Sequence, residues 1–395
     1  MLGVLTVCHT RPYHAGAQIS GVLQRWQQFP EWQRILVLLI SSRVALVVAA
    51  SVALAMLPMS SRHLGLLPEL PWLQPWAQWD AQHYVAIAVS GYETPEQSYS
   101  NVAFFPLYPL LMRLLAAPFG PVTEQSAALA GLVISNVALF LALLYLSKLV
   151  ARDLTLSVAQ RSVLYMAVFP TTLFLSSVYA ESLFLLLAVA SLYHARKGEW
   201  YLAGGAAFLA ALTRPFGLLL IVPLAVELLR QRASPRAWPS LVLPPAGLII
   251  FFGYLWWLFG DPLAYFEAGE QGWDRGLNPP WETLAAYAEG PLQLFDWPYA
   301  WVDLLSMAVM LVLVRIGWRL LPTSYSAYAT VALVFALSAG EAWFSASRHA
   351  LAIFPVMVVL ALMGERRSFN LAWLAFSSVV ALAFMARVAV GYWAA

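Results

Sequence analysis

The sequence has little charge, since Asp, Glu, Lys and Arg make up 11% of its 395 residues. A soluble domain carries roughly 25% charged residues. Hydrophobic residues make up 61% of the chain, so a soluble globular protein is excluded. The chain also lacks a basic excess, because 22 Lys and Arg stand against 20 Asp and Glu. Binding to nucleic acid needs such an excess, and no nucleic acid partner is therefore expected.

Cysteine is almost absent. The single Cys8 excludes an internal disulfide framework and a thiolate zinc site. The two histidines near the charged motifs described below, His83 and His349, are too few and too scattered for a metal set, so no metal site is expected. An apolar stretch over 2–7 is too short for the core of a signal peptide. The first long apolar run is therefore interpreted as a retained membrane span.

Long apolar runs dominate the rest of the chain. Runs of roughly 15–25 apolar residues bounded by charge are typical of membrane-spanning helices, which need about 20 residues. They predict an all-α, multi-pass membrane protein with about eleven transmembrane helices. The predicted helices cover 34–57, 124–149, 162–178, 182–195, 200–213, 216–230, 238–258, 300–320, 324–344, 349–363 and 369–390.

Successive predicted helices cross the membrane in alternate directions, which assigns each basic residue in the connecting segments to one side. Fifteen of the 22 fall on one side of the membrane in this arrangement, and cytoplasmic loops are enriched in Lys and Arg. The N-terminal segment 1–33 is therefore predicted to be cytoplasmic, ahead of one transmembrane domain over 34–395 with an extracytoplasmic C-terminus. The fifteen are Arg11, Arg25, Arg34, Lys148, Arg152, Arg161, Arg196, Lys197, Arg230, Arg232, Arg236, Arg315, Arg319, Arg366 and Arg367.

Two segments are too long and too polar to be turns, 58–123 and 260–299, and both fall on the extracytoplasmic side. They are rich in Trp, Tyr and Pro, which favours ordered structure at the membrane interface over a disordered linker. Within the first loop, residues 104–119 are expected to form an interfacial helix. The second loop is acidic, which is interpreted as a solvated outer surface.

Ionisable residues within an apolar chain are costly and indicate function. Four stand near the outer ends of predicted helices: Asp80, Glu181, Arg214 and Arg348. The helices that flank Glu181 and Arg214 are short, and at ~1.5 Å per residue each rises about 25 Å, less than the ~30 Å hydrocarbon core. A recess open to the outside is therefore predicted. Because Arg offers a bidentate fork to phosphate oxygens, a phosphate-bearing substrate is favoured.

Each of these residues has a structural alternative. Asp80 is a favoured residue type for capping a helix N-terminus, and Glu181 with Arg214 could form a buried structural ion pair. Arg348 suits a structural role less well, because a cation at a helix start opposes the helix dipole and favours an anionic partner. The aromatic run 103–109 could pack in the core or line a lipid groove.

An ordered set of motifs resembles the GPI mannosyltransferase II (PIG-V type) family of the C-type glycosyltransferase superfamily. The similarity extends from the first predicted span to Pro355. It is carried by Trp79-Asp80 with His83-Tyr84, Gly91-Tyr92, Ala103-Phe104-Phe105-Pro106-Leu107-Tyr108-Pro109, Phe169-Pro170, Tyr179-Ala180-Glu181-Ser182, Thr213-Arg214-Pro215-Phe216-Gly217, and Arg348 with Phe354-Pro355.

The resemblance implies an inverting transfer of mannose from a β-linked polyprenyl-phosphate-mannose on the extracytoplasmic side, giving an α-mannoside. It implies no cofactor beyond this lipid-linked donor. Asp80 matches the superfamily's essential acidic residue in the first outer loop, and its expected role is that of general base. Arg348, Arg214 and His349 are expected to bind the donor phosphate. The remaining expected substrate contacts are Glu181, Trp79, His83, Tyr84, Tyr108 and Tyr179.

The chain is short for a eukaryotic member and its loops are compact, which suggests a prokaryotic homologue in a plasma membrane. A bacterium makes no GPI anchor, so the acceptor lipid or glycan stays unassigned. Three alternatives are considered. One is an inactive homologue that serves as an assembly subunit, which an intact Asp80 disfavours. A C-type transferase of another sugar would have the same motifs, whereas a multi-pass transporter predicts ionisable residues near the membrane midplane and repeated halves.

Overall fold

The computed structural model describes residues 28–62, 64–94, 99–273, 276, 278–289, 300–338 and 345–394. Cys8, the basic residues Arg11 and Arg25, and 290–299 of the second outer loop lie outside these ranges. The described residues form α-helices and short 3-10 helices, with no β-strand among them. The α-helices are α2 (Glu31–Met56), α3 (Ala81–Ser90), α4 (Leu107–Ala116), α5 (Glu124–Asp153), α6 (Leu156–Ala167), α7 (Glu181–Lys197), α8 (Trp200–Ala211), α9 (Ile221–Arg230), α10 (Leu243–Phe259), α11 (Ala264–Trp273), α12 (Pro280–Glu289), α13 (Ala300–Leu320), α14 (Thr323–Leu337), α15 (Ala346–Ala352), α16 (Pro355–Met363) and α17 (Arg367–Ala389).

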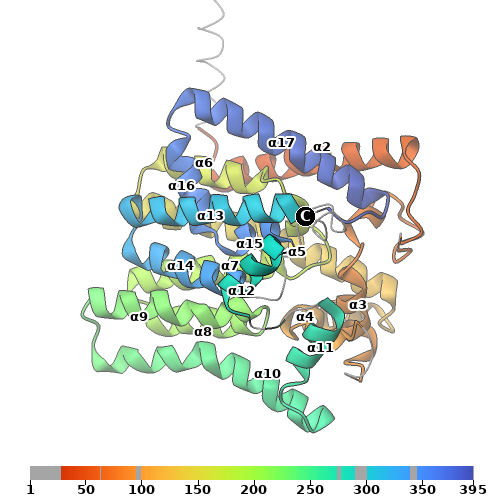
Figure 1. The fold of residues 1–395 in the computed structure, drawn as a ribbon, viewed down its shortest axis with the longest axis horizontal. Helices are drawn as coiled ribbons and strands as arrows, with labels where there is room; N and C mark the ends of the chain where they lie inside the picture. Colours follow the sequence, from red (N-terminus) through yellow and green to blue (C-terminus); the bar gives the residue numbers. More distant parts are fainter. Residues whose placement is uncertain are drawn as a thin grey trace, which may run out of the picture.

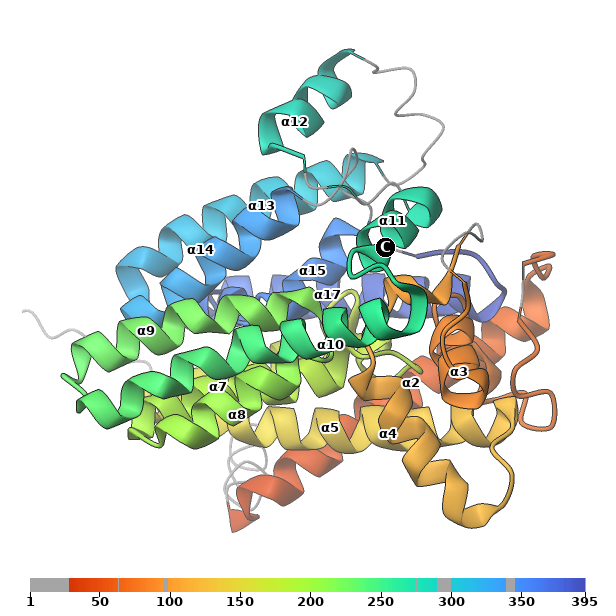
Figure 2. The same cartoon turned by 90° about the horizontal axis from the view of Figure 1, so that it is seen from below.

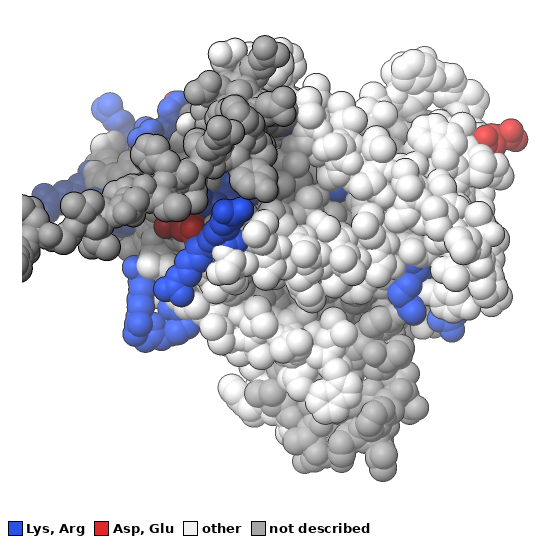
Figure 3. Space-filling model, turned by 90° about the horizontal axis from the view of Figure 1, so that it is seen from above, with Lys and Arg blue, Asp and Glu red and all other residues white. Residues whose placement is uncertain are grey.

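Five helices are long and apolar enough to cross a membrane, or up to six if one bent pair counts as a single span. The five cover Glu31–Met56, Glu124–Asp153, Pro235–Phe259, Trp301–Leu320 and Arg367–Ala389. The face formed by α2 and α17 has a broad uncharged area. Most of the Lys and Arg side chains in view lie toward one side of it, and a few lie at the opposite side (Figure 3). An all-α membrane protein is thus confirmed. The number eleven stays a prediction, because the other helices are shorter.

The helix predicted over 162–178 is wrong in its second half, since α6 ends at Ala167. Pro170 explains the break: the residue before a proline is disfavoured in the helical region, and proline itself donates no hydrogen bond. The freed backbone carbonyls find partners from other helices. Arg43 of α2 donates to the carbonyl of Ala167 at 3.3 Å, and Ser377 of α17 donates to that of Val168 at 2.6 Å. Non-helical backbone inside a membrane protein is tolerated where it is satisfied in this way.

The helix predicted over 349–363 is instead two helices, α15 and α16, which meet at an angle of 94°. The break precedes Pro355, which is the first residue of α16 and suits that position because its φ is fixed near the helical value. The short α15, which carries Arg348, packs against α13, α7 and α14.

The long helices run alongside one another, with α9, α10, α13 and α14 roughly parallel in one view (Figure 1). Helix α5 packs against α4, α6 and α7, while α17 packs along α2. Helices α3, α4 and α11 gather at one end of the bundle (Figure 2). Along the sequence, α3 and α4 come between α2 and α5 and belong to the predicted first outer loop. Helix α11 follows α10 and belongs to the predicted second outer loop. Helix α4 covers 107–116 of the predicted interfacial helix.

Candidate functional site

Two carboxylates, those of Asp80 and Glu181, and two arginines, Arg214 and Arg348, form one cluster. Glu181 Oε1 accepts a hydrogen bond from Arg214 Nη1 at 2.5 Å and from Arg348 Nε at 2.5 Å. Arg348 Nη2 forms an ion pair with the same oxygen at 2.5 Å. Arg348 Nη1 also donates to Asp80 Oδ2 at 2.9 Å. The four residues come from four places in the chain that the sequence singled out separately. The structure therefore brings the predicted acidic and basic residues into one connected network.

Glu181 lies at the centre of the network. It is the first residue of α7, where a carboxylate is stabilised by the positive end of the helix dipole. Its side chain is 2% exposed, and its Oε2 has no hydrogen-bond partner among the described residues. The predicted pairing of Glu181 with Arg214 is present, yet Arg214 also lines the cavity described below. Glu181 is absent from that lining and holds the two arginines from behind.

Arg348 is enclosed by aromatic rings as well as carboxylates. Its guanidinium carbon lies 4.6 Å from the ring centroid of Tyr179, 4.8 Å from Phe174 and 5.9 Å from Trp393. Cations within about 6 Å of a ring face are attracted by its quadrupole. Arg348 is the third residue of α15, whose first amide, that of Ala346, donates to Asp303 Oδ1 of α13 at 2.7 Å. The buried Asp303 thus caps the helix that carries Arg348.

Asp80 precedes α3 but its side chain makes no capping hydrogen bond, so the capping alternative for this residue is not observed. Its backbone amide donates to the Tyr179 hydroxyl at 3.2 Å, and that hydroxyl donates to the carbonyl of Gln78 at 3.0 Å. Trp79 has a left-handed backbone, with φ at 59°, and packs edge-on against Trp393 at 5.5 Å. A non-glycine residue in this region costs of order 1–3 kcal/mol and persists where its surroundings hold it. Trp79 and Tyr179 therefore hold the backbone at Asp80 and so orient its side chain.

A cavity of about 320 Å³ opens beside the cluster. Its polar lining includes Asp80, Tyr84, Arg214, Arg348 and His349. The rest is largely apolar: Ala103, Phe104, Phe105, Pro215, Phe216, Leu218, Leu219, Leu248, Phe252, Tyr265, Phe266 and Phe335. The cavity is thus charged at one side and apolar elsewhere.

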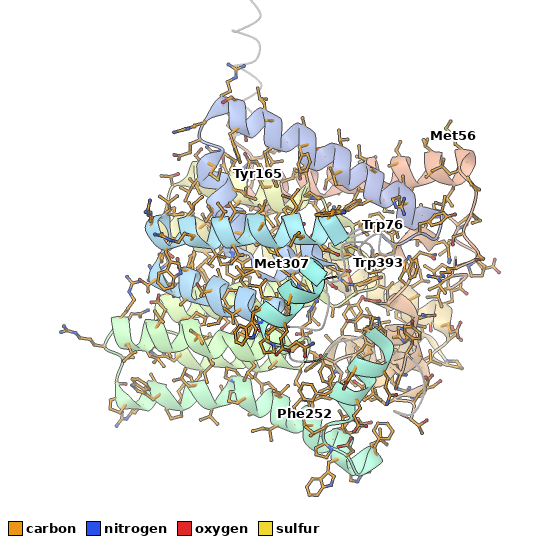
Figure 4. The ribbon with its side chains drawn as sticks, in the orientation of Figure 1. Met56, Trp76, Tyr165, Phe252, Met307 and Trp393 are labelled. Atoms are coloured by element: carbon orange, nitrogen blue, oxygen red, sulfur yellow. The ribbon has the colours of Figure 1, made fainter. Side chains whose placement is uncertain are left out.

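The apolar wall is built mainly by α10 and α11 on one side and by the 3-10 segment Pro215–Leu220 on another. Phe252 projects from α10 (Figure 4). Its ring lies 5.7 Å from that of Phe266 of α11 and 6.3 Å from that of Tyr265. Phe216 contacts both Phe335 and His349. The run 103–109 contributes Phe104 and Phe105 to the lining, so both alternatives for that run, packing and lining, hold in part.

Tyr84 is the one aromatic among the predicted substrate contacts that lines the cavity. Its hydroxyl makes no hydrogen bond within the described residues. Burial, followed by the nearby charge of Glu181, raises the pKa of Tyr84. Tyr84 therefore stays protonated at ordinary pH and keeps a hydrogen to donate to a bound molecule.

The other predicted substrate contacts lie behind the cavity wall. Trp79 and Tyr179 position Asp80, as described above, and His83 stacks on Phe104 at 4.8 Å. Tyr108 is fully buried, and its hydroxyl lies 2.8 Å from Ser135 and 2.9 Å from the Gly131 carbonyl. These four side chains support residues that line the cavity. Within the described part of the chain, no three His, Cys, Asp or Glu residues are grouped so that they could hold a metal ion.

Sequence reasoning missed three kinds of contributor. The wall residues of α10 and α11 have no local signal, because apolar residues are the background of this chain. Trp393 lies near the C-terminus, beyond the last recognised motif, yet it contacts Trp79 and Arg348. Asp303 is an isolated acidic residue inside an apolar run, and the cost of burying such a residue is the signal that could have found it.

The solved structures that resemble this chain include three crystal structures of the oligosaccharyltransferase of Archaeoglobus fulgidus. One is in complex with Zn and sulfate, with 14% identity, a TM-score of 0.40, and coverage of 88% of this chain and 53% of that one. One is tethered to an acceptor peptide containing the NVT sequon, with 14% identity, a TM-score of 0.42 and coverage of 89% and 55%. The third is the apo form, with 14% identity, a TM-score of 0.41 and coverage of 89% and 56%. The chain spans just over half the length of these structures.

No curated protein matches the sequence. A sequence model of one family, described as mannosyltransferase (PIG-V), matches residues 28–231, which is more than half of the chain. The matched range includes Asp80, Glu181 and Arg214, whereas Arg348 lies beyond it. This is the family that the ordered motifs resembled. On this match, the chain is a member of the mannosyltransferase (PIG-V) family.

Proposed function

We propose that this protein transfers mannose from a polyprenyl-phosphate-mannose to a hydroxyl of a lipid-linked or glycan acceptor, on the extracytoplasmic side and with inversion. Membership of the family supports glycosyl transfer by a membrane enzyme. The donor, the side of the membrane and the stereochemistry are the parts that this proposal adds.

The observation that carries the proposal is the division of the cavity into a charged side and an apolar side. Arg214 and Arg348 suit phosphate oxygens, and Tyr84 offers a hydroxyl to a sugar. The rings of Phe252, Phe266 and their neighbours suit an isoprenoid chain. Small-molecule sites measure about 300–1,000 Å³, so a cavity of about 320 Å³ has room for the hexosyl phosphate. A soluble nucleotide-sugar donor would have no use for such an apolar wall.

The reaction forms a bond between the acceptor oxygen and the anomeric carbon, and it breaks the bond between that carbon and the phosphate oxygen. Asp80 accepts the proton of the acceptor hydroxyl as that oxygen attacks. The phosphate departs as a polyprenyl phosphate with one more negative charge, which Arg348 and Arg214 stabilise. Because the leaving phosphate needs no proton, one carboxylate is enough, unlike the pair of a glycosidase.

The Asp80–Arg348 ion pair affects this chemistry. An arginine beside a carboxylate favours its charged form and so makes it a weaker base. The donor phosphate would compete with Asp80 for Arg348, because both are anions that bind guanidinium. Binding of the donor would thereby release Asp80 to act on the acceptor, which orders the steps with donor before acceptor.

The proposal is tested by incubating the purified protein with polyprenyl-phosphate-mannose and a native lipid extract, followed by mass spectrometry. We expect an acceptor species whose mass rises by one hexose and whose new linkage is cleaved by an α-mannosidase. The same donor with glucose in place of mannose serves as the specificity control. Efficient transfer of glucose, but not of mannose, would reassign the sugar, and an added hexose resistant to α-mannosidase would contradict inversion.

A further inference from the structure

A second cavity, of about 410 Å³, lies at the opposite end of the bundle from the candidate site. Its lining comes from α2, α5, α6 and α17: Glu31, Arg34, Ile35, Leu38, Ser147, Ser157, Gln160, Arg161, Val163, Leu164 and Asn370. Asn370 is in the first turn of α17, whereas Trp393, which follows the other end of α17, contacts the candidate site. Ser147 is near the end of α5, twelve positions beyond Ser135, which hydrogen-bonds Tyr108 and the Tyr179 carbonyl behind the first site. The two cavities are therefore separate.

The two arginines of this second cavity pair with no carboxylate of the described residues. Arg161 Nη1 donates to the Ala361 carbonyl at 2.6 Å and its Nη2 to the Ser157 hydroxyl at 2.7 Å. The side chain of Arg34 makes no hydrogen bond or ion pair to any residue that the structure describes, and its Nε is buried. Buried guanidinium nitrogen without a partner is costly. At the first site Arg214 and Arg348 both form ion pairs with Glu181. Arg34 and Arg161 have no such partner among the described residues, so their charge can attract an anion.

The backbone adds to this positive potential. The cavity lies beside the first turns of α2, α6 and α17, which begin at Glu31, Leu156 and Arg367. Each helix N-terminus carries a partial positive charge, and anions bind well there. Arg34 and Arg161 stand close to these N-termini, where a cation is unfavourable unless an anion offsets it.

One acidic residue also lines the cavity. Glu31 accepts a hydrogen bond from the Ser147 hydroxyl, which partly compensates the negative charge of its carboxylate. Gln160 makes no side-chain hydrogen bond within the described residues, and Asn370 uses only its oxygen, which accepts from Tyr165 at 2.8 Å. Their amide groups are left to donate. The balance of two cations, one anion, three helix N-termini and two amide donors favours a monoanionic or dianionic guest.

We propose that this second cavity binds the phosphate of an anionic phospholipid. Ile35 and Leu38 of α2 line the cavity, and Val37, Val44 and Val48 of the same helix are exposed. An acyl chain can lie along this apolar face while the headgroup phosphate contacts Arg34 and Arg161. Basic pockets between membrane helices recognise anionic headgroups through this combination. A free phosphate ion shares the headgroup chemistry but makes no use of the apolar face.

The test is a titration of the purified full-length protein in detergent, read by native mass spectrometry as the fraction with bound lipid. Phosphatidylglycerol and phosphatidylcholine of equal chain length are compared. Wild type is expected to bind phosphatidylglycerol at least fivefold more tightly than phosphatidylcholine. Arg34→Gln should abolish most of this preference. Because the Arg34 side chain makes no hydrogen bond or ion pair with a described residue, the substitution breaks no observed polar contact.

Two further variants distinguish a loss of the lipid site from misfolding of the protein. Ser157→Glu places a carboxylate at the second position of α6, where it suits the helix dipole, pairs with Arg161 and repels phosphate. It should also remove the preference. Arg319→Gln removes an exposed arginine of α13 outside the cavity and should leave the preference unchanged.

An undiminished preference for phosphatidylglycerol in both Arg34→Gln and Ser157→Glu would overturn the proposal, as would equal binding of the two lipids by wild type. Inorganic phosphate at tenfold excess over lipid should displace no phosphatidylglycerol. Complete displacement would identify a site for the free ion. Because the readout is lipid binding, these outcomes are independent of whether the first site transfers mannose.

Discussion

At the scale of single residues, Arg348 is the side chain on which the candidate site depends most. It contacts two carboxylates and three aromatic rings, and it is buried. Taking one partner from such a group leaves a charge without compensation, which costs about 3–5 kcal/mol when a buried pair is broken. Asp80, Glu181, Arg214 and Arg348 together carry two charges of each sign. The formal charges of the cluster therefore balance, and the proposed donor phosphate would add a negative charge to it.

Glu181→Gln tests the holding role of the central carboxylate. The amide keeps the size of the side chain and one acceptor but loses the charge that pairs with Arg214 and Arg348. Since a displacement of about 1 Å at a reacting centre costs about 100-fold in rate, we expect turnover to fall at least that far. Thermal unfolding in detergent should also shift to lower temperature. Exposed Glu365→Gln is the matched control. Normal turnover in Glu181→Gln would mean that the arginines are positioned by other contacts.

The residues of the charged cluster could be predicted from the sequence, and the residues of the apolar wall could not. Asp80, Glu181, Arg214 and Arg348 stand out because charge is rare in this chain and expensive in a membrane. Phe252 and Tyr265 line the same cavity, yet they belong to a background in which aromatic residues make up 14% of the sequence. Their place depends on how α10 and α11 pack, which no local pattern encodes.

At the scale of elements, breaks in the helices bring the charged residues together. Glu181 is the first residue of α7, after the interruption at Pro170. Arg214 lies between α8 and the 3-10 segment Pro215–Leu220. Arg348 is in α15, which meets α16 at the 94° bend. Each break leaves a side chain at a helix end inside the bundle. The sequence indicated the apolar runs but not the breaks at Pro170 and Pro355, because proline predicts a boundary without saying whether a helix kinks or ends.

Gly217→Ala tests the packing that places Arg214. A Cβ at Gly217 would lie 2.2 Å from backbone atoms of Ala210 and Ala211, and backbone cannot give way as a side chain can. We expect a destabilisation of about 1–3 kcal/mol, the range for overpacking, together with reduced turnover as Arg214 shifts. In Gly205→Ala the new methyl meets nothing within 4 Å, so this variant in mid-helix α8 should gain about 0.5–1 kcal/mol. Unfolding in detergent measures both, and equal stability of the two variants would contradict the argument.

At the scale of the whole molecule, the two ends of the bundle differ in how their charges are paired. Helices α3, α4 and α11 gather at one end (Figure 2). The cavity of the candidate site has arginines paired with carboxylates, whereas the two arginines of the second cavity pair with no described carboxylate. The all-α membrane fold followed from the apolar runs alone. The orientation of the termini stays a prediction that rests on the distribution of Lys and Arg.

Single cysteines in a Cys8→Ala background test this orientation. Cysteine at exposed Glu93 or at exposed Gln271 should react in intact cells with a thiol reagent that cannot cross the membrane. Cysteine at exposed Ser234, on the predicted cytoplasmic side, should react only after permeabilisation. The reverse pattern would place the candidate cavity in the cytoplasm and remove the extracytoplasmic part of the proposed function.

The most direct test of the proposed chemistry is the turnover of Asp80→Asn with polyprenyl-phosphate-mannose, measured alongside binding of the same donor. Asparagine keeps the size of Asp80 and can still accept a hydrogen bond from Arg348, but it has no basicity. Exposed Glu69→Gln in the same loop is the matched control and should behave as wild type. If Asp80 is the general base, Asp80→Asn binds the donor and loses at least two orders of magnitude in turnover. Near-normal turnover in Asp80→Asn would contradict the account.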